Sequence, residues 1–264
     1  MRAKELNGTT LPDGLEALGE VLTLSEVMRL IEGTARWVDP ETFRLLPVWY
    51  PEHARRAYLY KKNWSERLTN TNKQSGHRED KREANVYASK ALTRALGLRS
   101  DDRPNWSCCH IWGVDDARNQ KPNAVVQDHK FYSCVGNMVL LPTPLKAFTD
   151  SIPSVKVMLR ICARHLYGWH CDHESMAGAV AEIDTWNDWD VYPASWPRPS
   201  FASVPRGAVK IGESVRRSAE QRLEQIHSDL INAGPHYPRE MVRDALKYWE
   251  GALKSWKIEL QPKE

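Results

Sequence analysis

The sequence predicts an α+β fold that is mostly helical, with a small strand–strand–helix unit embedded between helical flanks. Apolar residues recur at helical spacing on both sides of the centre, whereas residues 105–141 are rich in β-branched, aromatic and cysteine residues. With 264 residues and 41% hydrophobic content, the chain is long enough to bury a substantial core. We expect one compact domain with three regions: basic and helical over 1–104, the central unit over 105–170, and a Trp/Pro-rich wrap with a helical hairpin over 171–264.

The N-terminal region is predicted to hold two helices. Thr23 and Glu26 stand at the spacing of a capping box, and Gly33 is a natural stop, so a first helix is expected over residues 23–33. Residues 78–97 are expected to form a longer helix that Gly97 ends. The polar stretch over 63–80 is expected to be a surface loop.

Two strands and two helices are predicted in the central region. The strands are expected at 106–114 and 124–141, joined by a long polar loop over 115–123. Helices are expected at 143–150 and 152–169, because Pro144 and Pro153 suit first-turn positions. The predicted order is therefore strand, loop, strand, helix.

The C-terminal region changes character at residues 184–206, which hold four closely spaced prolines and three tryptophans. Tryptophans need apolar surface to pack on, so this stretch is expected to be an ordered, extended wrap. A helical hairpin is expected to follow, with helices over 213–234 and 238–260 that are broken at 233–238.

Composition excludes several classes of protein. There is no run of eighteen apolar residues, and the N-terminus lacks the pattern of a signal peptide, so we expect a cytoplasmic protein with no membrane partner. Five cysteines, an odd number, argue against a disulfide framework and favour free thiols.

The charge is distributed unevenly along the chain. Residues 55–99 hold twelve basic and four acidic residues, whereas 174–190 hold five acidic residues and no Lys or Arg. A polyanion such as DNA would bind the basic stretch, although solvated helix faces would give the same composition. The residues that we expect to contact DNA are Lys61, Lys62, Trp64, Arg67, Lys73, Arg78, Lys81 and Arg82, with Trp64 able to stack on a base if it is exposed.

His110 is predicted to end the first strand, Asn137 to lie near the end of the second, and Lys146 to lie nine positions later on the short helix. The segments "CHIWG" and "NMVLLPTPLK" that hold these residues resemble the HNH family of nucleases, which have the ββα-metal fold. The resemblance covers about a sixth of the chain and implies a DNA endonuclease, in restriction or phage defence, that can act as a homodimer. It assigns His110 as the general base, Asn137 as the residue that fixes the loop, and Lys146 as the third site residue.

Phosphodiester hydrolysis needs a base for water and positive charge at the phosphate, which Mg²⁺ or Mn²⁺ usually supplies. Two residues depart from the family pattern: Cys109 is a soft ligand, and Lys146 cannot bind a metal while it is protonated. Other residues would then hold the metal, or Lys146 itself would supply the charge, or the protein would bind DNA without cleaving it. The candidate ligands are Cys109, Asp128, His129 and Asp150, with Asp115 and Asp116 also near in sequence.

Each of these residues also has a purely structural interpretation. His110 would bond a carbonyl at a strand end, Asn137 would supply a turn, and Lys146 would be a solvated helix lysine. A structural zinc site is the alternative metal centre, although no C-x-x-C pair is present. Its candidate ligands are Cys109, Cys134, Cys162, Cys171, His165, His170 and His173.

Overall fold

The computed structural model describes residues 5–6, 9–10, 13–71, 73–113 and 123–259. Helices dominate the described chain, and the strands are short and pair two by two, so the fold is a mostly helical α+β fold as predicted. The helices are α1 (Gly14–Gly19), α2 (Leu24–Thr34), α3 (Pro40–Leu45), α4 (Val86–Ala95), α5 (Ala124–Gln127), α6 (Thr143–Ser151), α7 (Pro153–Tyr167), α8 (Ala177–Asp184), α9 (Glu213–Asn232) and α10 (Arg239–Glu259).

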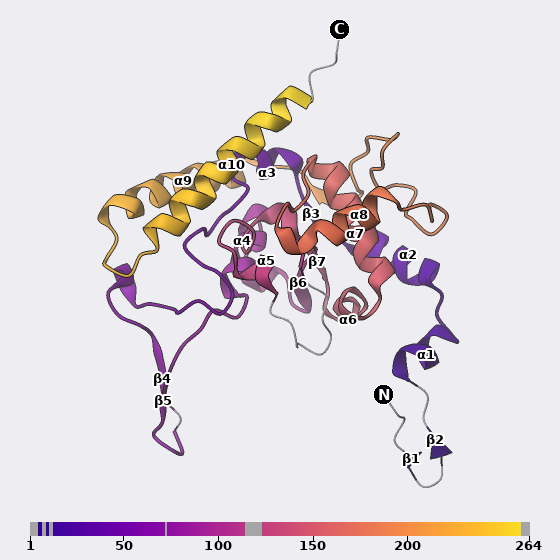
Figure 1. Ribbon diagram of the computed structural model, residues 1–264, viewed down its shortest axis with the longest axis horizontal. Coiled ribbons are helices and arrows are strands. Elements are labelled where there is room, and N and C mark those ends of the chain that lie inside the picture. The colour runs from indigo at the N-terminus through magenta and orange to yellow at the C-terminus, as the bar shows by residue number, and fades with distance from the viewer. Residues whose placement is uncertain (1–4, 7–8, 11–12, 72, 114–122, 260–264) are drawn as a thin grey trace.

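Each described sheet has two strands. The antiparallel pairs are β1 (Glu5–Leu6) with β2 (Thr9–Thr10), β4 (Thr69–Thr71) with β5 (Arg78–Asp80), and β6 (Trp106–His110) with β7 (Met138–Pro142). A parallel pair joins β3 (Trp37–Val38) to β8 (Ala208–Val209). Figure 1 shows β6 and β7 at the centre of the molecule, with helices around them and the α9–α10 hairpin along one side.

Local sequence signals explain several helix boundaries. The capping box at the start of α2 is present, because Oγ1 of Thr23 accepts from the Glu26 backbone and the Glu26 carboxylate accepts from the Thr23 backbone. Prolines stand in the first turns of α6 and α7, and Gly168 ends α7 in the left-handed conformation with φ of 64°. The C-terminal hairpin breaks at residues 233–238, as predicted.

Two predicted elements of the basic region differ from the structure. The stretch over 63–80 contains the β4–β5 hairpin, so it is not simply a loop. The helix predicted over 78–97 starts only at Val86, since Asn85 has a φ of 80° and breaks the helical backbone before it. The β4–β5 hairpin extends away from the body of the protein.

The predicted second strand is also much shorter than expected. Residues 124–127 form α5, whose first turn is capped by Oδ1 of Asn123, and only Met138–Pro142 pairs with β6. The predicted loop over 115–123 lies almost wholly outside the described residues.

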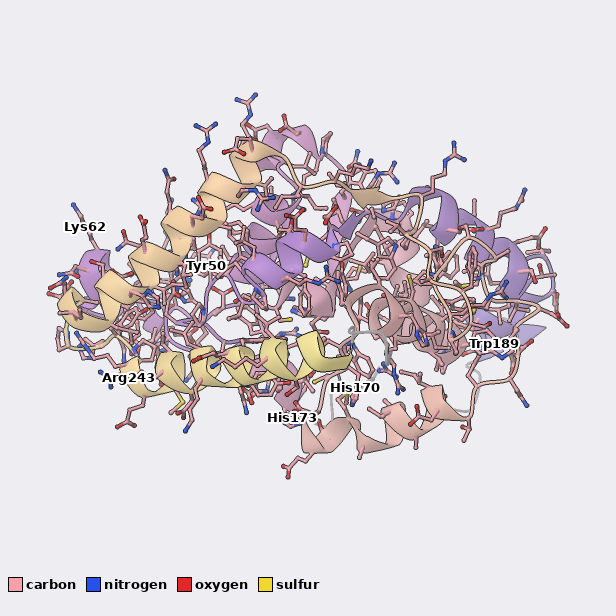
Figure 2. The ribbon with its side chains drawn as sticks, turned by 90° about the horizontal axis from the view of Figure 1, so that it is seen from above. Tyr50, Lys62, His170, His173, Trp189 and Arg243 are labelled. Carbon is pink, nitrogen blue, oxygen red and sulfur yellow. The ribbon has the colours of Figure 1, made fainter. Side chains whose placement is uncertain are left out.

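The hydrophobic core draws on all three predicted regions, from Val27 on α2 to Trp249 on α10. The predicted wrap contributes Trp196, which is 1% exposed and packs edge-on against Trp37 at 5.6 Å between ring centroids. Figure 2 places Trp189 of the wrap and Lys62 at the base of the β4–β5 hairpin at opposite ends of the molecule. Within the described chain, no helix combines the length and the apolar character needed to cross a membrane.

Candidate active site

The central unit is an antiparallel hairpin followed by a helix. The register pairs Cys109 with Val139 and His110 with Met138, and α6 packs against both strands. One further backbone bond, from Ile111 N to Asn137 O over 2.9 Å, extends the hairpin past His110. The two strands and the following helix are present, with His110 at the end of β6 and Lys146 on α6, but α5 lies in the connection between β6 and β7.

His110 is held in one orientation by a backbone carbonyl. Its Nε2 lies 3.0 Å from the carbonyl oxygen of Tyr132. A carbonyl can only accept, so Nε2 carries the hydrogen, and Nδ1 of the neutral ring is left as the acceptor. Within the described residues, no hydrogen bond reaches Nδ1. The ring therefore presents the nitrogen that a general base needs.

The surroundings of His110 keep its imidazole neutral. Burial is the main cause that lowers its pKa, to about 4, and the bond to Tyr132 opposes this in part. Three nearby cations lower the pKa further: Lys156, Arg55 and Lys146. The side chain is half-buried. At neutral pH the ring is thus an uncharged acceptor in a positive environment.

Asn137 ties together the two ends of the segment between the strands. Its Oδ1 accepts a hydrogen bond from Trp112 N over 2.6 Å, and its Nδ2 donates one to the Phe131 carbonyl over 3.2 Å. The residue is completely buried. It stands just before β7, not near the end of that strand as predicted.

Lys146 pairs with Asp150 one turn later on α6. The Nζ–Oδ2 distance is 2.5 Å, and both side chains are about half exposed, at 45% and 54%. The hydrogen bond to Asp150 is the main cause that raises the pKa of Lys146, so its amine stays charged. The positive charge near His110 is consequently permanent at neutral pH.

Cys109 lies near the same lysine. Burial raises the pKa of its thiol to about 11, although Lys146 and Lys156 oppose the shift. The buried Lys156 donates to the Thr149 carbonyl over 3.4 Å. At neutral pH Cys109 is therefore a neutral thiol.

The described donors around α6 do not fit Mg²⁺ or Mn²⁺. These ions prefer several carboxylate, carbonyl or water oxygens, and need deprotonated ligands. Here the side chains are a neutral thiol, an ammonium group and one carboxylate that already binds that ammonium group. Asp115 and Asp116, which were also candidates, lie outside the described residues.

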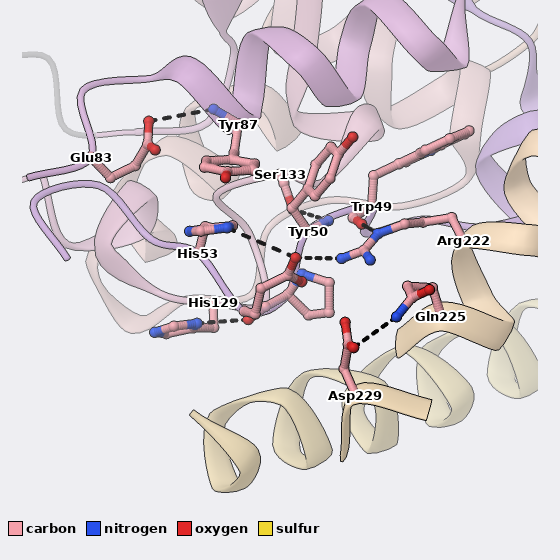
Figure 3. Close-up of polar contacts among 12 residues, drawn as sticks. Trp49, Tyr50, His53, Glu83, Tyr87, His129, Ser133, Arg222, Gln225 and Asp229 are labelled. Atoms are coloured by element: carbon pink, nitrogen blue, oxygen red, sulfur yellow. Dashed lines mark hydrogen bonds and ion pairs between the residues drawn. The ribbon is translucent and has the colours of Figure 1, made fainter. Parts of the chain in front are cut away.

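Asp128 and His129 are engaged elsewhere. Asp128 accepts from Lys130 N over 2.8 Å and pairs with the Lys130 ammonium at 3.3 Å. Nδ1 of His129 donates to the Pro51 carbonyl over 2.6 Å, beside the cluster drawn in Figure 3. Asp150 lies on α6, and Cys109 lies on β6, against which α6 packs. The structure therefore does not bring the four predicted ligands together.

The predicted zinc ligands are not assembled either. All five cysteines are free, and Cys109, Cys134, Cys162 and Cys171 are buried. Burial is the main cause that raises their thiol pKa values. In the part of the chain that the structure describes, no three His, Cys, Asp or Glu side chains are grouped so that they would hold a metal ion.

All of the predicted DNA-contacting cations lie within residues 58–82, a stretch that includes the β4–β5 hairpin and that we call the basic arm. Some of them are paired: Lys61 with Glu66 at 2.7 Å, and Arg67 with Asp80 at 2.9 Å. Others are exposed and, among the described residues, have no ion pair: Lys62, Lys73, Arg78 and Arg82. Lys81 is half-buried, and its backbone N–H donates to Leu68 O over 2.7 Å.

Trp64 is a packing residue at the base of the arm. Its ring lies 5.2 Å from each of the rings of His53, Tyr60 and Tyr237. The Trp64 carbonyl also accepts from His236 N over 3.3 Å, which ties the arm to the α9–α10 connection. Trp64 is therefore only partly exposed and already packs against three rings, and its contact with a base stays a prediction.

Sequence reasoning missed Tyr132, Arg55 and Lys156 as neighbours of His110. Tyr132 acts through its backbone carbonyl, which every residue type has, so the sequence gives no sign of this contact. Lys156 did leave a signal, because a lysine within the apolar run of α7 must be buried, and it is 6% exposed. The comparisons with family models, curated proteins and solved structures found no match to this chain.

Proposed function

We propose that the protein is a DNA endonuclease of the HNH type that hydrolyses phosphodiester bonds, with His110 as the general base. The main support is the hydrogen bond from Nε2 of His110 to the Tyr132 carbonyl, since it fixes the tautomer whose Nδ1 accepts a proton. This imidazole ends the first strand of a strand–strand–helix unit, as the resemblance to the HNH family implies.

In this reaction, a water oxygen attacks phosphorus and its proton passes to Nδ1 of His110. The bond from phosphorus to the leaving oxygen then breaks, and that oxygen takes a proton from solvent. Charge grows on the phosphate oxygens in the transition state, where a fixed cation stabilises it. Lys146 is the side chain that we assign to this task, because its amine stays charged and its charge acts on His110.

DNA is the proposed partner, held through the basic arm by contacts to phosphates. Restriction or phage defence is the proposed setting. A homodimer is the proposed state on duplex DNA, because cleavage of both strands calls for two active sites. Light scattering of the protein with and without a duplex oligonucleotide tests this stoichiometry.

A DNA-binding or regulatory protein that has this fold but lacks hydrolysis is the second candidate. The pKa of about 4 for His110 favours it, because such an imidazole accepts protons weakly at neutral pH. The poor fit of the α6 donors to Mg²⁺ points the same way.

Incubation of supercoiled plasmid with purified protein separates the two candidates. Parallel reactions contain EDTA, Mg²⁺ or Mn²⁺, and each is repeated with His110→Ala and Lys146→Ala. We expect cleavage by the wild type, also in EDTA, and its loss in both variants. Salt-sensitive DNA binding without cleavage in any reaction would favour the second candidate. Cleavage that needs a metal but not Lys146 would overturn the role given to this lysine.

A further inference from the structure

A second group of cations surrounds Tyr50. Three side chains lie within cation–π distance of the Tyr50 ring: Arg222 at 4.8 Å, Lys90 at 5.6 Å and Arg94 at 5.9 Å. Lys90 and Arg94 stand one turn apart on α4, and Arg222 reaches across from α9. The three cations thus converge on one aromatic ring from two helices.

Their charge is only partly balanced. Arg222 is buried and bonds to the Glu52 carboxylate and, over 2.7 Å, to the Trp49 carbonyl (Figure 3). Lys90 and Arg94 are exposed, and no described carboxylate forms an ion pair with either of them. Like charges one turn apart on a helix repel each other. The group therefore holds three positive charges against the single negative charge of Glu52.

The hydroxyl of Tyr50 adds an independent sign of a ligand. Tyr50 is 4% exposed, and its hydroxyl is buried without a hydrogen-bond partner among the described residues. Buried hydroxyls without partners are rare, and an unseen ion or ligand is one explanation for them. Burial raises the pKa of this hydroxyl, while the charges of Arg94 and Arg222 lower it in part. The three cations and this hydroxyl outnumber the one carboxylate, Glu52, that pairs with Arg222, and this excess of positive charge suits an anion.

The site is continuous with the basic arm through a row of aromatic rings. Tyr50 contacts Tyr87 at 5.2 Å, Tyr87 stacks on His53 at 3.4 Å, and His53 contacts Trp64 at the base of the arm at 5.2 Å. This row of rings links the base of the arm to the group around Tyr50, where Lys90 and Arg94 are exposed.

We propose that Tyr50, Lys90, Arg94 and Arg222 form a binding site for a phosphate group of a nucleic-acid backbone. The site is separate from His110 and would hold the strand beside the arm. This proposal rests on the proposed function in one respect: the phosphate is taken to belong to nucleic acid because the endonuclease would act on DNA.

The first test measures DNA binding by Lys90→Ala/Arg94→Ala as a function of salt. Each phosphate contact contributes about one to the magnitude of the slope of log K against log salt, so loss of this single phosphate site should lower that magnitude by about one. The matched control, Arg29→Ala/Lys254→Ala, removes one arginine and one lysine from exposed positions on α2 and α10. This control should keep the wild-type slope. Equal slopes in all three proteins, or an equal loss in the control, would overturn the proposal.

A second test uses inorganic phosphate at constant ionic strength and requires no DNA. Phosphate should raise the Tm of the wild type more than that of Lys90→Ala/Arg94→Ala. Tyr50→Phe removes only the unpartnered hydroxyl, so it should keep the Tm without phosphate but show a smaller phosphate-induced shift. Identical shifts in the wild type and both variants would contradict the site. A wild-type shift that both variants reduce, in a protein that cleaves no DNA, would support this site while the endonuclease proposal fails.

Discussion

Oδ1 of Asn137 accepts a hydrogen bond from the backbone N–H of Trp112 over 2.6 Å, and this contact joins the start of the segment between the strands to its end. Asn137→Ala should remove it, together with the bond from Nδ2 to Phe131. The buried Trp112 N–H would then lack a partner, whereas the Phe131 carbonyl still accepts from Cys134 N over 3.3 Å. The free energy of unfolding should therefore fall by roughly 1–3 kcal/mol. Urea denaturation measures the change.

Asn232→Ala is the control for that variant, because Asn232 is exposed and bonds only to Ser228 Oγ at 3.3 Å. Its stability should stay within about 0.5 kcal/mol of the wild type. Equal effects of the two substitutions would show that Asn137 does not fix the segment.

The buried pair of Glu52 and Arg222 should be far more sensitive to truncation than an exposed pair. Both side chains are less than 10% exposed, at 7% and 8%. Glu52→Ala would leave the Arg222 charge buried and unpaired, at a cost of about 3–5 kcal/mol in unfolding free energy. Glu250→Ala breaks the exposed pair with Lys254, and thermal unfolding should show no clear loss. A small effect of Glu52→Ala would mean that water reaches Arg222.

Acid should destabilise the protein through its buried histidines. Burial is the main cause that lowers the pKa of His53 to about 3 and of His110 to about 4. The unfolded chain takes up these protons near pH 6.5 and the folded chain does not, so stability should fall as the pH drops from about 6.5 toward 4. Each histidine contributes at most about 1.4 kcal/mol per pH unit. Glu52, whose pKa burial raises, acts in the opposite direction.

Unfolding free energies of the wild type and His53→Phe between pH 7 and pH 4 test this account. Phenylalanine can keep the stack on Tyr87 but binds no proton, so the variant should lose stability less steeply. Parallel curves for the two proteins would show that His53 is already protonated, or accessible to protons, in the folded state.

Substitutions of Trp64 and Lys62 should affect different properties of the arm, its stability and its DNA binding respectively. Trp64→Ala removes contacts with three rings, so it should lower the Tm by several degrees. Lys62→Ala should leave the Tm unchanged and lower the salt dependence of DNA binding by about one phosphate contact. A filter-binding or anisotropy titration at several salt concentrations makes the comparison. Loss of DNA binding in Trp64→Ala at unchanged Tm would instead indicate that Trp64 stacks on a base.

Local signals in the sequence predicted the fold best. The capping box of Thr23 and Glu26 and the first-turn prolines Pro144 and Pro153 each act within one helical turn. Such signals can be recognised in the sequence without knowledge of the rest of the chain. The β4–β5 hairpin was not predicted, because most of its residues face solvent on both sides and show no alternation. The α5 helix was missed because a short apolar run fits a strand and a helix equally well.

The candidate site was predicted only in part, for a related reason. The sequence placed His110 at a strand end and Lys146 on the following helix, and the structure places them there. The Tyr132 carbonyl and Arg55 reach His110 only through tertiary packing, so no motif marks them. The same is true of Arg222, which lies more than 160 residues from Glu52 in sequence.

The rate of plasmid cleavage by His110→Ala, compared with the wild type at equal DNA occupancy, tests the central proposal most directly. A general base contributes about 10²–10⁴-fold to the rate, so the variant should cleave at least about 100-fold more slowly while it binds DNA with unchanged affinity. Cleavage by His110→Ala within about twofold of the wild-type rate would contradict the assignment of His110 as the base.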